Sequence, residues 1–182
     1  MFIQTEQTPN PATLKFIPGR AVMDQGTADF RAPTSGASPL ADRLFAVDGV
    51  AGVFLGADFI SVTKAEGGDW AALKPMVLGA IMEHYTSGRP AVVADAAVCG
   101  EDEGADSDIV VQIKELLDTR VRPAVAQDGG DIVFRRYEDG IVYLRMQGSC
   151  SGCPSSSATL KIGIENMLKH YIPEVREVRP AE

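Results

Sequence analysis

The feature that most limits the fold is a short acidic segment in the middle of the chain. Residues 94–107 contain five Asp or Glu, no Lys or Arg, and otherwise small residues. They therefore carry −5 of the net charge of −8. A segment of this composition cannot bury enough apolar surface to fold by itself. We therefore predict two small domains, 1–93 and 108–182, joined by an acidic linker.

The rest of the composition excludes several classes of protein. The charge outside the linker is nearly balanced and forms no basic stripe, which argues against nucleic acid as a partner. No apolar run approaches the roughly 20 residues that span a bilayer, so no membrane partner is expected. The first residues resemble neither a secretion signal nor an Arg-rich transit peptide, and this favours a cytoplasmic protein.

The first domain reads as α+β. Alternating apolar residues, bounded by Pro and Gly, predict strands. Ser38 followed by Pro39 predicts the start of a helix, and a longer apolar period predicts a second helix that begins or kinks near Pro75 and stops at Gly88. Its buried stripe would include Met82 and Tyr85. The expected elements are strands at 13–17, 50–55 and 59–64, with helices after Ser38 and at 70–85.

The second domain is also α+β. Asp139-Gly140 between two apolar runs is a strong signal for a β-hairpin. A helix capped by Ser107 or Asp108 precedes this hairpin and is broken or re-capped at Pro123. The fold class is therefore α+β, with two small domains that each consist of a small sheet covered by helices. The expected elements are a helix from 108, strands at 131–137 and 141–146, a helix at 155–171 that buries Tyr171, and an edge strand at 175–178.

A C-x-x-C pair, Cys150 and Cys153, lies at the turn between the second hairpin strand and the last helix. A helix N-terminus favours negative charge, so we expect exposed thiols with a lowered pKa, suited to bind a metal. Two thiolates are only half of an iron–sulfur or zinc cage. Two chains related by a two-fold axis would supply four. Cys99, within the linker, is a weaker candidate for a third ligand.

Spacing alone leaves other interpretations of the pair open. A dithiol–disulfide redox centre is as plausible as a metal or cluster site, although no tryptophan precedes the first cysteine and the proline follows the second. Half of a zinc ribbon and a structural disulfide are further alternatives.

Other polar residues favour structural interpretations. Asp128 and Asp131 flank two glycines in a turn. Trp70 is expected to anchor a domain. The two histidines, His84 and His170, are expected to be partly exposed and structural. Three arginines of the hairpin, Arg135, Arg136 and Arg145, could meet an acidic client or simply form a solvated sheet face.

The motif around the cysteines resembles a known family. Gly148-Ser149-Cys150-Ser151-Gly152-Cys153-Pro154 and the upstream Asp128-Gly129-Gly130-Asp131 resemble the C-terminal domain of NifU and Nfu-type proteins. Arg122-Pro123 and Ile172-Pro173-Glu174-Val175 agree with this. The stretch Gln7-Thr8-Pro9-Asn10-Pro11 resembles the N-terminal domain of the Nfu branch. The resemblance covers nearly the whole chain.

This resemblance implies an iron–sulfur cluster scaffold or carrier rather than an enzyme. Such proteins hold a labile cluster, usually [4Fe–4S] and alternatively [2Fe–2S], between two subunits, and Cys150 and Cys153 match the family's ligands. The implied partners are a second copy of the chain, apo iron–sulfur proteins and upstream cluster-assembly proteins. Mitochondrial relatives carry a transit peptide, so the expected source is a bacterial cytoplasm, with a mature mitochondrial form as the less favoured alternative.

Overall fold

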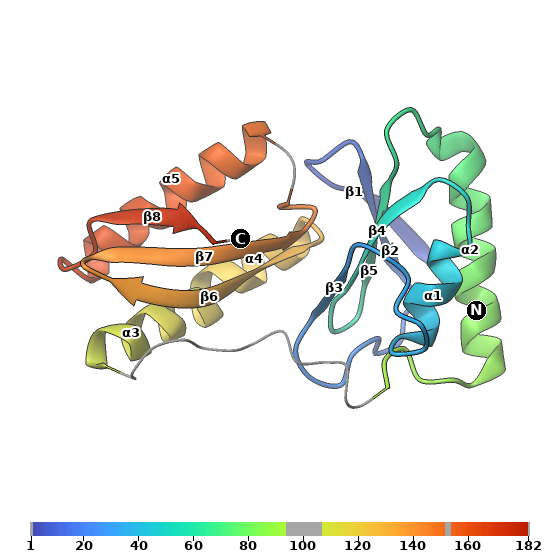
Figure 1. The fold of residues 1–182 in the computed structure, drawn as a ribbon, viewed down its shortest axis with the longest axis horizontal. Coiled ribbons are helices and arrows are strands. Elements are labelled where there is room, and N and C mark those ends of the chain that lie inside the picture. Colours follow the sequence, from blue (N-terminus) through green and yellow to red (C-terminus); the bar gives the residue numbers. More distant parts are fainter. Residues whose placement is uncertain (1, 94–106, 152–153, 182) are drawn as a thin grey trace. The chain divides into compact units, whose positions relative to one another are not determined.

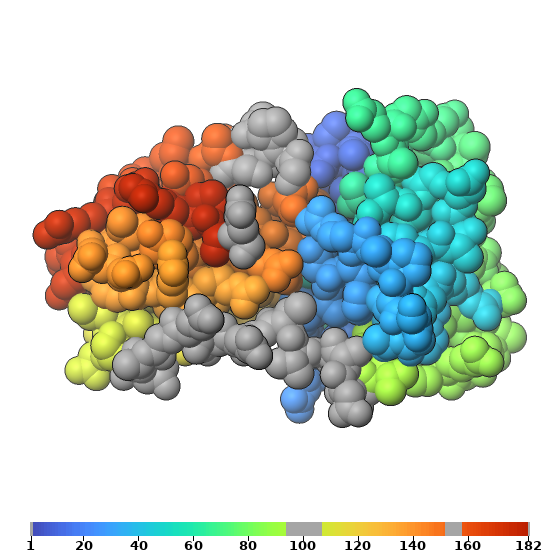
Figure 2. Space-filling view, in the orientation of Figure 1, coloured from blue at the N-terminus to red at the C-terminus, as the bar shows by residue number. Residues whose placement is uncertain are grey.

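The structure is a computed structural model that describes residues 2–93, 107–151 and 154–181; the others are grey in Figures 1 and 2. The chain forms two compact units, Met1–Cys99 and Gly100–Glu182. The α+β class predicted from the sequence is confirmed in both. The predicted linker lies outside the described residues except for Ser107. No helix among the described residues is long and apolar enough to span a membrane.

The first unit is a five-stranded antiparallel sheet with helices α1 and α2 packed on one face (Figure 1). The sheet order is β1-β2-β5-β4-β3. Its core is formed by apolar residues of the central strands and of both helices. The elements are β1 (Gln4–Gln7), β2 (Thr13–Ile17), β3 (Ala28–Phe30), α1 (Pro39–Phe45), β4 (Val50–Leu55), β5 (Ile60–Lys64) and α2 (Trp70–Ser87).

Local signals place the helix ends of this unit. The Ser38 Oγ accepts a hydrogen bond from the Ala41 N–H at the start of α1, and Gly88 ends α2 with φ of 68°. The expected span from Trp70 is confirmed, and the alternative start at Pro75 was wrong, because α2 begins at Trp70 and continues through the proline. A kink at Pro75 stays a prediction. A proline near a helix start removes one backbone hydrogen bond, and the remaining turns still pack on the sheet.

The buried face of α2 differs from the predicted stripe. Leu73, Val77 and Ile81 are buried as one helical face, whereas Met82 is 45% exposed. His84 continues the buried face and is 1% exposed, so the expectation that it is partly exposed was wrong. The true stripe is rotated by about one residue from the predicted one, and its orientation is set by packing on the core of the first unit.

The second unit is a three-stranded sheet of order β6-β7-β8, with the helices on one side (Figure 1). Strands β6 and β7 are antiparallel, and β8 is parallel to β7. Strand β8 begins two residues later than predicted, since Val175 closes a turn onto the Ile172 carbonyl. The elements are α3 (Asp108–Leu116), the π-helical turn η1 (Leu117–Val121), α4 (Arg122–Gln127), β6 (Gly130–Glu138), β7 (Ile141–Gly148), α5 (Pro154–Tyr171) and β8 (Glu177–Pro180).

The hairpin of this unit confirms the prediction from Asp-Gly. Asp139 and Gly140 both have positive φ, 50° and 81°, as a two-residue hairpin turn requires. The core-facing residues of β6 and β7 pair across the strands, for example Ile132 with Met146 and Phe134 with Leu144. A bulge follows Phe134, so that two residues of β6 oppose Tyr143.

Two helical expectations for the second unit need correction. The helix from Asp108 is not broken at Pro123: it passes through η1 and continues as α4, with the proline in the first turn of α4, where its missing N–H costs little. Tyr171 is 47% exposed, because the next residue, Ile172, occupies the core instead.

Candidate functional site

Cys150 lies where the sequence predicts, at the turn between β7 and α5. Gly148 ends β7 with φ of 62°, and the Ser151 N–H donates to the Gly148 carbonyl at 3.1 Å. The Ser149 N–H donates to the Gly129 carbonyl at 3.2 Å, and its hydroxyl donates to the Asp128 carbonyl. The turn before β6 therefore anchors residues 148–151, the described start of the cysteine loop (residues 148–153). Gly152 and Cys153 lie outside the described residues.

The thiol of Cys150 is buried, contrary to the expected exposed pair. Only 6% of this residue is exposed, and it belongs to the core of the second unit. Gly130 makes room for it: a Cβ at Gly130 would stand 2.5 Å from the Cys150 Sγ and 2.8 Å from the Gln147 carbonyl oxygen. The sulfur and the glycine backbone are therefore in close contact.

The electrostatics of this thiol also differ from the expectation. Burial raises the pKa of Cys150 to about 11, and the negative charges of Asp128 and Asp131 act in the same direction. A hydrogen bond with Ser149 lowers the pKa by less. For Cys150 the predicted lowering by the helix N-terminus was wrong, because the effect of a helix dipole is confined to its first turn and α5 begins only at Pro154.

An ion pair fixes the strand that carries Gly130. The Arg122 Nε and Nη2 donate to the two carboxylate oxygens of Asp131, each at 2.9 Å. Asp131 is 3% exposed and also accepts the Ile132 N–H. Arg122 further donates to Asp118, and these hydrogen bonds raise its pKa. A bidentate pair of this kind restrains both partners, so α4 and the start of β6 are held together beside Cys150.

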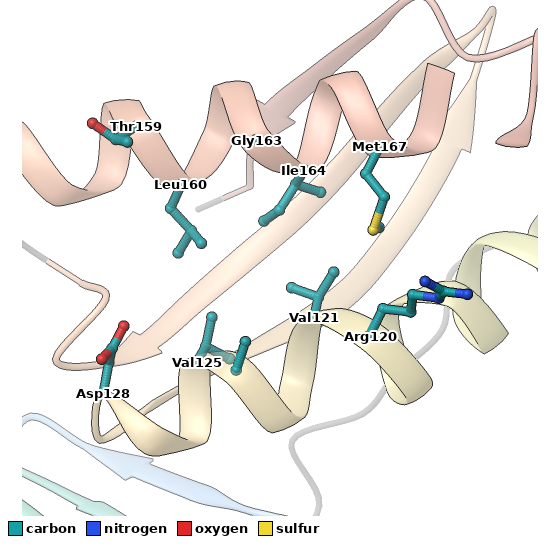
Figure 3. A pocket seen from close by; sticks show the side chains of 10 residues that line it. Arg120, Val121, Val125, Asp128, Thr159, Leu160, Gly163, Ile164 and Met167 are labelled. Carbon is teal, nitrogen blue, oxygen red and sulfur yellow. The ribbon is translucent and has the colours of Figure 1, made fainter. Parts of the chain in front are cut away.

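An apolar cavity of about 430 Å³ lies between α4 and α5 (Figure 3). Asp128, which anchors the cysteine loop, is at one end of the lining, and Arg120 lies toward the other. A side chain at Gly163 would meet no atom within 4 Å, so α5 leaves this space open. Its apolar walls are Val121, Ala124, Val125, Leu160, Ile164 and Met167.

The other candidate residues do not join this site. Asp128 and Asp131 serve the turn and the ion pair, as their structural interpretation predicts. His84 belongs to the first unit, and His170 is exposed on α5. Cys99 lies outside the described residues. Within the described ranges no three His, Cys, Asp or Glu side chains gather as a metal site. Sequence reasoning from the residues missed the roles of Gly130 and Arg122; a Gly-Gly pair before a strand is the local signal that marks a close backbone approach.

Comparison with known families adds to this geometry. Residues 3–88 match the family model described as scaffold protein Nfu/NifU N terminal, and residues 113–179 match the NifU-like domain. A solved NMR structure of a NifU-like protein from Saccharomyces cerevisiae is 22% identical, with a TM-score of 0.47, over 52% of this chain and 86% of that one.

Several curated relatives are similar over almost the whole chain. The NFU1 iron-sulfur cluster scaffold homolog, mitochondrial, of Drosophila sechellia is 56% identical over 98% of this chain and 64% of its own length. NifU-like protein 4, mitochondrial, of Arabidopsis thaliana is 53% identical over 98% of this chain and 65% of its own length. The human NFU1 homolog is 52% identical over 98% of this chain and 71% of its own length. The chain thus spans slightly less than two thirds of the fly and plant relatives.

These names correct the expected location. Relatives at 52–56% identity are named mitochondrial, which points to a mitochondrial protein, so the expectation of a bacterial, cytoplasmic protein was wrong. That expectation was drawn from the first residues, and targeting segments are removed from mature proteins, so the start of a chain is a poor guide to its compartment. The two family models and the identity to the human relative together show that the chain belongs to the Nfu family of iron–sulfur cluster scaffold proteins.

Proposed function

We propose that this chain is a carrier that holds a labile iron–sulfur cluster, [4Fe–4S] or alternatively [2Fe–2S], and passes it to apo iron–sulfur proteins. The cluster is cargo, received from upstream assembly proteins, and the chain itself performs no catalysis. The observation that carries this proposal is the position of Cys150 on a tightly anchored turn in a chain of the scaffold family, with Cys153 three residues later in the sequence.

The number of sulfur donors supports sharing between two chains. A cubane cluster takes four cysteine ligands, and the cysteine loop has only Cys150 and Cys153. A two-fold axis through the cluster brings two such loops together, as in an isologous dimer. In this arrangement the cluster lies at an interface, where an apo-protein with its own thiols can reach it.

The burial of Cys150 supports a cargo that is readily released. Its Sγ packs against Gly130 in the structure described here, so binding to a shared cluster requires the sulfur to leave the core. The packing lost in this way offsets part of the free energy of cluster binding, and release of the cluster restores the packing. The thiol chemistry of the loop fits an iron–sulfur cluster, for which cysteine sulfur is the usual ligand.

The test is anaerobic reconstitution with iron and sulfide, followed by iron and acid-labile sulfide analysis and by native mass spectrometry. We expect one cluster for two chains. Cys150→Ser or Cys153→Ser should abolish loading, whereas Cys99→Ser should load as the unmodified chain does, because it lies outside the loop.

Two results would overturn the proposal. One is a loaded protein that is monomeric, with all its ligands from a single chain. The other is catalytic reduction of disulfides by the iron-free chain, which would identify a dithiol–disulfide redox protein instead. A separate assay measures cluster transfer directly, as the activation of an apo iron–sulfur enzyme by the loaded chain.

A further inference from the structure

The sheet of the second unit has one face that no helix covers in the described part of the unit. Ile132, Phe134, Val142, Leu144 and Val178 point to the helices and form the core. Side chains alternate between the two faces of a strand, so the residues between them point to the other face. The strand pairings place three arginines and one tyrosine together there: Arg145 opposite Val133, Arg136 opposite Tyr143, and Arg179 beside Tyr143.

Tyr143 lies at the centre of this group. The guanidinium of Arg136 lies over its ring, 4.3 Å from the centroid, which is a cation–π contact. Glu138 is only loosely paired with Arg136, at 4.0 Å. On the other side of the tyrosine, Arg179 donates two hydrogen bonds to Glu177, at 3.0 and 3.1 Å. This last pair has the fork geometry in which a guanidinium binds a carboxylate.

The remaining cations have no such partner. The side chain of Arg145 makes no ion pair or hydrogen bond with any described residue, and neither does the side chain of Arg135 in the bulge opposite Tyr143. Both residues are half-buried, so packing restricts the motion of their side chains at the surface. Four arginines against two glutamates give this face a positive charge on a chain whose net charge is −8.

We propose that this arginine face, defined as Arg135, Arg136, Tyr143, Arg145 and Arg179, docks an acidic polypeptide segment of a partner protein. The proposal rests on the proposed carrier function, for which it supplies a recognition surface. Arg135 and Arg145 supply unpaired guanidinium groups, and guanidinium groups bind carboxylates in a bidentate manner. Tyr143 supplies a flat apolar surface among them.

A peptide fits this face better than a nucleic acid does. Glu138 and Glu177 are interleaved with the arginines, so a continuous phosphate backbone would meet repulsion at two points. The overall negative charge also opposes a long polyanion. Separate carboxylates on a peptide can match Arg135 and Arg145 and avoid the two glutamates.

The face is also well placed for delivery of a cluster. Strand β7 carries Tyr143 and Arg145 and ends at Gly148, where the cysteine loop starts. Gly148 lies three residue steps after Arg145 along the strand, about 10 Å at ~3.4 Å per residue. A partner docked on the arginine face therefore lies beside the loop without occupying it.

The test uses the full chain, isotopically labelled and free of cluster, with a short synthetic peptide of alternating Glu and Gly. NMR titration should shift the amide signals of β6, β7 and β8. Arg145→Gln and Arg135→Gln should each weaken binding about two- to fivefold, the range for an exposed charge pair. Arg145→Lys should retain part of the affinity because it keeps the charge. The matched control is Arg120→Gln, which removes the same charge from the helical side and should leave the affinity unchanged.

Several outcomes would overturn the arginine face as an acidic-peptide site. One is that a peptide with Gln in place of Glu binds as tightly as the Glu peptide, and another is that the shifted amide signals lie outside the three strands. A third is that Arg120→Gln weakens binding as much as Arg145→Gln does. The last is that a single-stranded oligonucleotide of equal charge binds more tightly than the peptide. The outcome is separate from that of the carrier proposal. Arg145→Gln should still load a cluster, and Cys150→Ser should still bind the peptide, so either proposal can fail alone.

Discussion

Gly130 is the residue on which the packing around Cys150 depends most. A methyl group at this position would be placed 2.5 Å from the Cys150 Sγ and would also meet two backbone atoms, so the cysteine loop and β6 would have to separate. Overpacking of this kind costs about 1–3 kcal/mol. We predict that Gly130→Ala lowers the free energy of unfolding of the second unit by that amount, measured by urea denaturation.

The control for this substitution is Gly163→Ala in the same unit. A Cβ at Gly163 meets nothing within 4 Å, and this glycine lies within α5. Alanine has the better helix propensity by about 1 kcal/mol, so this variant should be as stable as the unmodified chain or more so. Equal losses in the two variants would show that Gly130 has no special packing role.

His84 gives the first unit a pH-dependent stability. It is 1% exposed, and its Nε2 has no hydrogen-bond partner in the described structure. Burial lowers the pKa of His84, and the positive charges of Arg43 and Arg89 act in the same direction, whereas a backbone hydrogen bond at Arg89 opposes them. The folded state therefore holds the neutral imidazole, while the unfolded chain takes up a proton below a pH of about 6.5.

The sign of this effect follows from proton uptake by the unfolded state. We predict that the first unit is fully stable above about pH 6.5, the ordinary histidine pKa, and loses stability as the pH falls from there toward the lowered pKa. Trp70 is the only tryptophan, so its fluorescence reports the unfolding of this unit. His84→Gln should flatten the pH dependence, and His170→Gln, at an exposed position on α5, should not. An unchanged slope in His84→Gln would contradict this account.

At single positions, sequence reasoning succeeds where a residue acts within its own segment. The positive φ values were predictable, because Gly88 ends a helix and Gly140 forms a hairpin turn. The burial of Cys150 was not predictable, because the space for its thiol exists only where Gly130, twenty residues away in the sequence, has no side chain. His84 was misjudged for a similar reason, since its exposure depends on which face of α2 packs on the core of the first unit.

At the scale of elements, the start of α1 is tied to a distant part of the chain. Ser38 is fully buried; its Oγ accepts from the Ala41 N–H at 3.1 Å and donates to the Ala91 carbonyl at 2.6 Å. Ser38→Ala removes the helix cap and leaves a carbonyl 53 residues away with one hydrogen bond fewer. We predict a loss of about 1–2 kcal/mol in the stability of the first unit, followed by Trp70 fluorescence.

The matched control is the cap of α2. Asp69 accepts from the Ala71 N–H at 2.9 Å but is exposed, so water can replace this bond. Asp69→Ala should cost well under half as much as Ser38→Ala. If the two costs were equal, the bond to Ala91 would contribute nothing beyond ordinary capping.

Elements with strong local signals were predicted with nearly correct bounds, and those that depend on pairing were not. The hairpin, β2, β4 and α1 are each marked by alternation, capping or turn residues. Strands β1 and β3 are short edge strands whose structure comes from pairing with β2 and β4, and nothing local marks them. The turn η1 was missed because apolar spacing cannot distinguish a π turn from an α turn.

At the scale of the whole molecule, each unit has a hydrophobic core of its own. One core is formed by residues between Phe16 and Ile81, and the other by residues between Val110 and Val178, with no member in common. We therefore propose, as the acidic composition of 94–107 suggests, that 1–93 and 108–182 are independent folding domains.

If the two domains are independent, each should unfold in its own transition, and a substitution should move only one of them. Ser38→Ala should shift the urea transition of the first domain, which Trp70 fluorescence reports. It should not shift the transition of the second domain, which the NMR amide signals of Ile132 and Val142 report. Gly130→Ala should do the reverse, because its clash is confined to β6, β7 and the cysteine loop. A shift of both transitions by either variant would mean that the domains share stabilising free energy. In that event Gly130→Ala would also weaken the first domain, and the acidic segment would not act as a simple linker.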